Sequence, residues 1–201
     1  MLKGEFDHSV KVMVGHNTNK GLVFTSPTAL SETGYSSFIK QVFPEIRPEV
    51  SEYITKVLYP PPPPIYNGSY GYTSPVQRVS LGISDLVFVC NADYLNWAFH
   101  NKTYGYLFSV PPALHGQDEA YTFFNGQDAS VANVTVVLAM QDYITSFVET
   151  GVPKSSLGPA FEEYGEQNGL LNLGLSEISA ILDPTAHARC RWWQKGEYYN
   201  G

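Results

Sequence analysis

Apolar residues follow two different periods along the chain. Short apolar runs at 9–14 and 104–110, bounded by glycine or proline, predict two buried strands. Apolar steps of three and four residues predict helices at 35–43, 48–58, 76–100 and 130–150. The segment after Pro153 shows neither period and is expected to be irregular. This alternation indicates an α/β protein, but two strands leave a parallel sheet short of neighbours, so we expect an incomplete central sheet.

The two longer helical segments each have an apolar stripe that we expect to be buried. In 76–100 the stripe carries Val79, Ile83, Leu86, Cys90, Tyr94 and Trp97. In 130–150 it carries Val131, Val134, Leu138, Ile144, Phe147 and Val148, and Gly151 ends the helix. A further aromatic group, Tyr121, Phe123 and Phe124, is interpreted as core rather than as the lining of a pocket.

Five consecutive prolines, Pro60–Pro64, must adopt the polyproline II conformation. Such a run is either a ligand for a proline-binding module or a stiff connector. Because the run occurs once, we favour a connector. We therefore expect residues 59–75 to form a Pro-rich surface connector within one partial domain that spans 1–201.

Composition narrows the possible partners. Charged residues are 15% of the chain, against about 25% in a typical soluble domain. Hydrophobic residues are 43% and aromatic residues 14%, which suits the interior of a larger protein. Lys+Arg number 12 against Asp+Glu 19, and no cationic cluster is evident, so nucleic acid is not an expected partner. No apolar run approaches the roughly 18 residues of a membrane span.

Two kinds of motif bear on the cellular compartment. Three N-x-S/T sequons make Asn67, Asn101 and Asn133 candidate glycosylation sites. The two cysteines, Cys90 and Cys190, are either buried thiols or a pair. Together these features favour the secretory pathway. A chain that starts at Met1 has no signal peptide and would remain cytoplasmic, so we expect the true start to lie upstream.

Polar loops that follow strands are the places where chemistry is expected in an α/β sheet. One such loop is Gly15–Gly21 and the other is Ala113–Glu119. In the second, His115 stands beside Gly116, where it is either a general base or an ordinary surface histidine. The other histidines lack metal-ligand spacing, no C-x-x-C or dinucleotide fingerprint occurs, and we expect no metal and no cofactor. Three partial matches to G-x-S-x-G fail at the second glycine, so no nucleophile is identified.

Four segments in order carry a resemblance to a known family. Gly15–Gly21 followed by Leu22–Phe24 is similar to the family segment G-x-N-x-[DN]-E-G with its apolar run. Leu114–Asp118 resembles the catalytic-histidine loop, H-G-x-[DE]. Ser84–Cys90 and Cys190–Trp193 resemble the segments that hold the later half-cystines. The chain thus resembles the C-terminal part of type-B carboxylesterases, the family of cholinesterases and fungal lipases, and is most similar to secreted fungal members.

This resemblance implies the C-terminal portion of an α/β-hydrolase fold, with the last two sheet strands and their packing helices. It implies that His115 is the triad histidine, which takes a proton from a serine and returns it to the leaving group. Asp118 would be a supporting carboxylate beside that loop. Cys90 and Cys190 would form a disulfide.

Two departures from the family pattern affect the expected activity. The triad acid should be a glutamate, and Lys20 occupies its position. The nucleophilic serine and the oxyanion loop belong to the family's N-terminal part. We therefore expect a carboxylic-ester hydrolase by ancestry that is inactive alone and acts on a small ester only if an N-terminal part completes it. The alternatives are a non-catalytic cholinesterase-like binding or scaffold protein, or a relic gene product.

Overall fold

The structure is a computed structural model that describes residues 4–61, 68, 70–185 and 188–199. Its contacts divide the chain into two compact units. Unit 1 consists of Met1–Thr18 and Ala92–Ala186, and unit 2 consists of Asn19–Asn91 and His187–Gly201. Among the described residues, no helix is long and apolar enough to cross a membrane.

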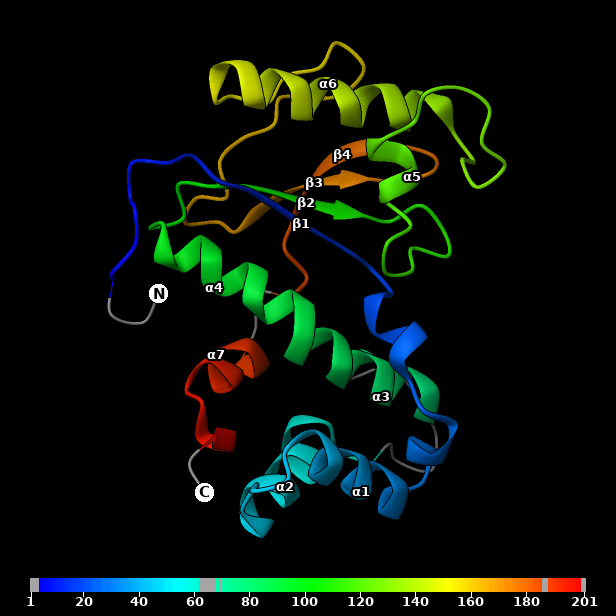
Figure 1. Ribbon diagram of the computed structural model, residues 1–201, viewed down its shortest axis with the longest axis vertical. Helices are drawn as coiled ribbons and strands as arrows, with labels where there is room; N and C mark the ends of the chain where they lie inside the picture. The colour runs from blue at the N-terminus through cyan, green and yellow to red at the C-terminus, as the bar shows by residue number, and fades with distance from the viewer. Residues whose placement is uncertain (1–3, 62–67, 69, 186–187, 200–201) are drawn as a thin grey trace. The chain divides into compact units, whose positions relative to one another are not determined.

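A mixed sheet forms the centre of unit 1 (Figure 1). Its strands, in spatial order, are β1 (Met13–Asn17), β2 (Tyr104–Phe108), β3 (Gly169–Leu173) and β4 (Ile178–Leu182). The first three are parallel, and β4 runs antiparallel to β3. Because β1 and β2 are parallel neighbours, the residues that follow them emerge at the same edge of the sheet.

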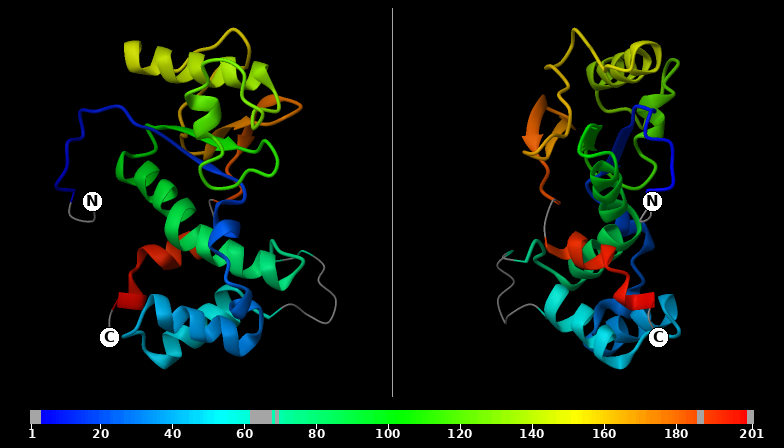
Figure 2. Two further views of the ribbon diagram at one scale, coloured as in Figure 1. Left: turned by 45° about the vertical axis from the view of Figure 1, so that its right-hand side comes forward. Right: turned by 90° about the vertical axis from the view of Figure 1, so that its left-hand side faces the viewer.

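The two faces of the sheet carry different clusters of apolar side chains. Tyr104 and Phe108 of β2 pack on one face with α6 (Val134–Thr150), which lies along that face in Figures 1 and 2. Leu107 points the other way and packs with Tyr164 and Leu170. This alternation is the period of two that a strand imposes, and burying each large apolar side chain contributes about 1.5–3 kcal/mol.

Helix α6 begins later than its apolar pattern predicted and buries a different face. Its first residue is Val134, and its buried side chains are Val136, Val137, Ala139, Met140 and Tyr143. The predicted stripe was wrong at Val134, Leu138 and Val148, which are 49%, 47% and 78% exposed. Apolar residues surround the first two turns of this helix, so the period alone does not choose between adjacent faces.

The predicted strand at 9–14 is also displaced in the structure. Strand β1 begins at Met13 and continues through Gly15 to Asn17. Gly15 was interpreted as the residue that ends the strand. It instead lies within the sheet, in register with Tyr106 of β2. A glycine is needed here because a side chain would collide with the Tyr106 ring, and not because the chain turns at this position.

The sheet has four strands where the sequence predicted two. Residues after Pro153 were expected to be irregular, but β3, β4 and α7 (Ala188–Gln194) lie there. Each of these strands has only five residues, and β4 is an edge strand whose Leu182 is 68% exposed. Runs this short give a weak periodic signal, and their pairing with each other across a turn is what stabilises them.

Unit 2 is built from helices. They are α1 (Glu32–Val42), α2 (Pro48–Tyr53), α3 (Pro75–Ser84), the start of α4 (Cys90–Ala98), and α7. Short 3-10 segments at Lys20–Phe24, Pro27–Leu30 and Glu197–Tyr199 and π-helical turns at Ile54–Leu58 and Asp85–Val89 complete it. The short helix α5 (Glu119–Thr122) belongs to unit 1. Figure 1 labels the α-helices.

The π-helical turn explains one wrong prediction about burial. Trp97 was placed on the same stripe as Val79, but it is 40% exposed, whereas Val79 is buried. A π turn inserts an extra residue into the helical repeat, which rotates the following residues away from the extrapolated face. Cys90 is 3% exposed, in agreement with its predicted place in the core.

A disulfide and a buried polar network connect α7 to the helices of unit 2. Cys90 and Cys190 are bonded, as the resemblance implied, across 100 residues of sequence. A covalent loop of that length stabilises the folded state by about 4–5 kcal/mol in the chain-entropy model. Asp85, fully buried, accepts hydrogen bonds from Tyr59 and from Arg189, each at 2.8 Å. Trp193 donates to the Tyr59 hydroxyl at 2.9 Å.

The Pro-rich segment is described only at its ends. Residues 62–67 and 69, which include most of the proline run, lie outside the described residues. Tyr59 and Tyr72, within the predicted connector 59–75, are 0% and 3% exposed. Tyr59 and Tyr72 therefore belong to the core of unit 2. A connector that lies only on the surface would not bury such side chains.

Candidate functional site

The loop that follows β2 presents His115 to solvent at the carboxyl end of the strand. Val110 and Ala113 are buried and anchor the start of the loop. Ala113 and Gly116 have left-handed backbone conformations, with φ of 53° and 80°. The carbonyls of Val110, Leu114 and Gly116 each accept a turn hydrogen bond from the backbone N–H three residues later. The loop is therefore compact, with the His115 side chain exposed at its outer side.

Gln117 fastens the loop from within. Its side-chain oxygen accepts a hydrogen bond from the Leu114 N–H at 3.1 Å. Its side-chain amide donates to the Pro111 carbonyl at 3.3 Å. One side chain thus satisfies backbone groups on both sides of the turn that leads to His115, which limits the conformations open to that residue.

Asn17 attaches the same loop to the neighbouring strand. It is the last residue of β1, and it is fully buried. Its side-chain amide donates to the Leu114 carbonyl at 2.6 Å and to Oδ1 of Asp118 at 2.8 Å. Both amide hydrogens are used on the His115 loop, so two hydrogen bonds join the carboxyl end of β1 to the loop that follows β2.

Asp118 is held from a second direction by a tyrosine of the sheet. The Tyr106 hydroxyl forms a hydrogen bond with the Asp118 carboxylate. Burial, and then the Asp118 charge, raise the pKa of Tyr106 above its usual range. The phenol therefore remains a neutral donor at physiological pH. Asp118 was predicted as a supporting carboxylate, and the structure brings it together with Asn17 and Tyr106.

Gly15 makes room for this tyrosine. A Cβ built at Gly15 would overlap Cζ of Tyr106, far inside the contact distance. The ring of Tyr106 therefore passes across Gly15, its register partner in β1, before the hydroxyl reaches Asp118. Any larger residue would displace the ring.

Lys20 belongs to unit 2, whereas His115 belongs to unit 1. Lys20 is the first residue of the 3-10 segment Lys20–Phe24, and its Nζ lies 5.6 Å from the centroid of the Phe88 ring. A cation over an aromatic face is stabilised by the ring quadrupole. The next residue, Gly21, donates its N–H to Ser84 at 2.8 Å and has no space for a Cβ.

Two of the three predicted glycosylation sites, Asn101 and Asn133, lie among the described residues. Asn133 is the N-cap of α6 and accepts from the Thr135 N–H at 2.9 Å. Asn101 has a φ of 60°, and its sequon partner Thr103 is buried, with its hydroxyl bonded to Asn96. Asn67 lies outside the described residues. Glycosylation stays a prediction.

Asn17, Tyr106 and Gln117 were not identified from the sequence. Asn17 stood in the predicted polar loop, and Tyr106 stood in the predicted strand, but neither position revealed its partner. Within the described part of the chain, no three histidine, cysteine, aspartate or glutamate side chains are grouped as metal ligands.

The sheet and its packing helices define the fold as part of an α/β-hydrolase fold. The crystal structure of Aspergillus niger EstA is similar, with a TM-score of 0.74 at 18% identity, over 92% of this chain and 40% of that one. Two curated relatives are carboxylesterases named patB. The Penicillium expansum protein is 30% identical over 199 residues, and the Aspergillus clavatus protein is 31% identical over 196 residues. No family model matches the chain.

These relatives confirm the predicted resemblance to part of a fungal type-B carboxylesterase. The alignments cover 98% and 97% of this chain but 35% of each relative. The chain therefore spans about a third of the length of the curated relatives that it matches.

Proposed function

We propose that this chain is the histidine-bearing part of a carboxylic-ester hydrolase, with His115 as its general base and general acid. The observation that carries the proposal is the loop after β2, which Asn17 joins to β1 through two hydrogen bonds. A histidine that moves a proton to and from a serine must be held within hydrogen-bond reach of it. The two hydrogen bonds that hold this loop to β1 support such a role for His115.

In this proposal Asp118 and Tyr106 position the loop and do not exchange protons with substrate. Asp118 accepts from Asn17 and from Tyr106, so its charge is offset by two donors. His115 takes the serine proton during attack on the ester carbonyl and returns it to the leaving alcohol. The serine is expected from the remaining two-thirds of the parent protein, since the 201 residues contain no G-x-S-x-G.

The chain by itself is proposed to be inactive. The sequence holds no G-x-S-x-G motif for a nucleophile, and Lys20 stands at the position of the acid in the family motif. An imidazole N–H needs an acceptor, which an ammonium group is not, and neutralising a triad acid already lowers kcat by about 10⁴. The Cys90–Cys190 bond supports an oxidising compartment, and we propose secretion for the parent protein.

The test is a chimera in which these 201 residues replace the matching part of the Penicillium expansum carboxylesterase. We expect the purified chain to leave p-nitrophenyl acetate intact and the chimera to be at most weakly active. Lys20→Glu in the chimera should raise kcat by at least about 10³. His115→Ala in that background should abolish the gain. Equal activity of the chimera with and without Lys20→Glu would refute the acid assignment, and activity without His115 would refute the role of the histidine.

A second candidate is a non-catalytic cholinesterase-like binding protein. The contact between Lys20 and Phe88 favours this candidate, because the aromatic ring stabilises the lysine at the position where the family motif has a glutamate. Under this alternative, the chimera with Lys20→Glu would gain no activity although it binds substrate. Circular dichroism of both chimeras shows whether a loss reflects chemistry or misfolding.

A further inference from the structure

A pocket in unit 1 lies at the opposite end of β2 from His115. We call it the amino-end pocket; its principal lining residues are Tyr104, Pro153, Lys154, Phe161, Glu162 and Glu163. Tyr104 is the first residue of β2, whereas His115 follows the carboxyl end of that strand. The volume is about 720 Å³, within the range of small-molecule sites.

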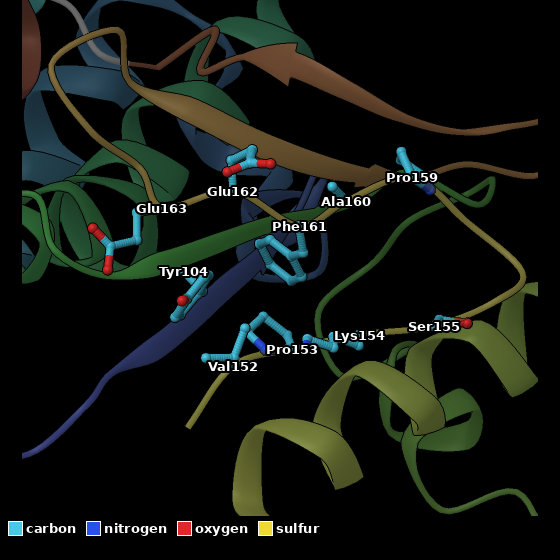
Figure 3. Close-up of a pocket in the computed structure, with 10 residues that line it drawn as sticks. All are labelled: Tyr104, Val152, Pro153, Lys154, Ser155, Pro159, Ala160, Phe161, Glu162 and Glu163. Atoms are coloured by element: carbon cyan, nitrogen blue, oxygen red, sulfur yellow. The ribbon is translucent and has the colours of Figure 1, made fainter. Parts of the chain in front are cut away.

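Two aromatic side chains form the apolar part of the pocket. Tyr104 and Phe161 are 8% and 6% exposed, and their rings meet edge to face at 5.7 Å. Figure 3 shows both rings between the glutamates on one side and the Val152–Lys154 segment on the other. Aromatic surfaces of this kind bind flat apolar groups and attract cations through the ring quadrupole.

The carboxylates give the pocket its charge. Glu162 and Glu163 are exposed neighbours on the loop before β3, and both line the pocket. After burial, the charges of Glu163 and Glu162 are the causes that raise the pKa of Tyr104. The phenol thus experiences both carboxylates. Lys154 is a cation that also lines the pocket, and it opposes part of this negative potential.

The Tyr104 hydroxyl is available to a ligand. The residue is more than nine-tenths buried, yet among the described residues the hydroxyl has no hydrogen-bond partner. Figure 3 shows the phenol oxygen at the pocket. The hydroxyl oxygen itself is accessible, unlike most of the ring, so a ligand in the pocket can reach it.

From these observations we infer that the amino-end pocket binds a small organic cation with an apolar or aromatic body. The ammonium group of the ligand pairs with Glu162 and Glu163, and its apolar body lies on Phe161 and Tyr104. The Tyr104 oxygen accepts a hydrogen bond from the ammonium group. This site is separate from the proposed ester chemistry and does not depend on it.

Benzylamine, a cation at neutral pH, is a suitable probe, and benzyl alcohol is its uncharged counterpart. We expect benzylamine to shift the backbone NMR signals of Tyr104, Phe161, Glu162 and Glu163 in the full chain, with a Kd of about 1–10 mM. Benzyl alcohol should bind at least about fivefold more weakly. Equal binding of the two probes, or shifts elsewhere only, would overturn the inference.

Matched variants separate the pocket from the net charge of the protein. Glu162→Gln and Glu163→Gln should each weaken benzylamine binding about two- to fivefold, the effect of an exposed ion pair. Glu166→Gln, on the same loop but not lining this pocket, should leave Kd unchanged. Lys154→Gln should strengthen binding about twofold, and Tyr104→Phe should weaken it about threefold. A Glu166→Gln effect equal to that of Glu162→Gln would show that only overall charge matters and would refute the site.

Discussion

Individual side chains of the histidine loop illustrate how far single positions can be interpreted from sequence. His115 and Asp118 were predicted because Leu114–Asp118 resembles a short local motif of a known family, H-G-x-[DE]. Asn17 was not predicted, because its partner Asp118 is 101 positions away in the sequence. Tyr106 was not predicted either, because its contact with Gly15 depends on the pairing of β1 with β2. A local pattern contains no information about a partner so distant.

Asn17→Ala is expected to destabilise unit 1 by about 2–3 kcal/mol. The substitution removes two hydrogen bonds and leaves the Leu114 carbonyl and the Asp118 carboxylate without that donor in a partly buried site. Urea unfolding measures the loss, and amide exchange in the His115 loop should accelerate. Asn125→Ala, at an exposed position of the same unit, is the control and should stay within about 0.5 kcal/mol. Unchanged exchange in the loop would show that Asn17 does not hold it.

At the scale of elements, the helices were predicted more accurately than the strands. Ranges 35–43, 48–58 and 76–100 correspond to helical segments, because repeated steps of three and four residues are a strong signal over several turns. The error at Trp97 comes from a π turn, which depends on packing rather than on periodicity. Strands β3 and β4 exist through their pairing, which a five-residue run does not reveal.

Helix α6 offers a test in which one residue has two possible roles. Asn133 caps the helix and is also the acceptor of a sequon, so substitutions can separate these roles. In protein made without glycosylation, Asn133→Ala should cost about 1 kcal/mol because the Thr135 N–H loses its acceptor. Thermal unfolding measures this. Thr135→Ala destroys the same sequon but keeps the cap, so it should change stability by less than about 0.5 kcal/mol; equal losses would contradict the capping role.

For the whole molecule, the buried tyrosines link the stability of the fold to pH on the alkaline side. Burial is the first cause that raises the pKa of Tyr59, Tyr106 and Tyr164, and neighbouring aspartates add to it. The folded state therefore retains these protons after the unfolded chain has lost them. This stabilisation is complete below about pH 10, the ordinary pKa, and is lost as the pH rises from there toward the folded values.

We expect the free energy of unfolding to fall above about pH 10, by up to about 1.4 kcal/mol per pH unit for each such tyrosine. Absorbance at 295 nm should show a first group of phenols ionising near pH 10 and a second group ionising only as the circular dichroism signal is lost. Tyr164→Phe should make the pH dependence less steep by one proton. Ionisation of every tyrosine before unfolding would contradict the assignment.

The composition of the chain led to an expectation at this scale but could not specify the fold. Low charge and many aromatic residues predicted surfaces suited to contact with further protein. In unit 1, Phe123, assigned to the core from sequence, is 77% exposed, whereas Tyr121 beside it is fully buried. Neighbours in an aromatic patch can face opposite ways, and only the path of the backbone decides which one is covered.

The disulfide keeps the chain in one covalent piece after a single proteolytic cleavage between its two cysteines. Residues 92–186, which include three of the four strands, lie entirely between Cys90 and Cys190 in the sequence. The exposed turn at 125–130 lies inside this covalent ring. A protease that cuts once within that turn leaves two fragments that migrate as one molecule until a reductant separates them. A nicked chain can therefore look intact, and retain its strands in one molecule, as long as its surroundings are oxidising.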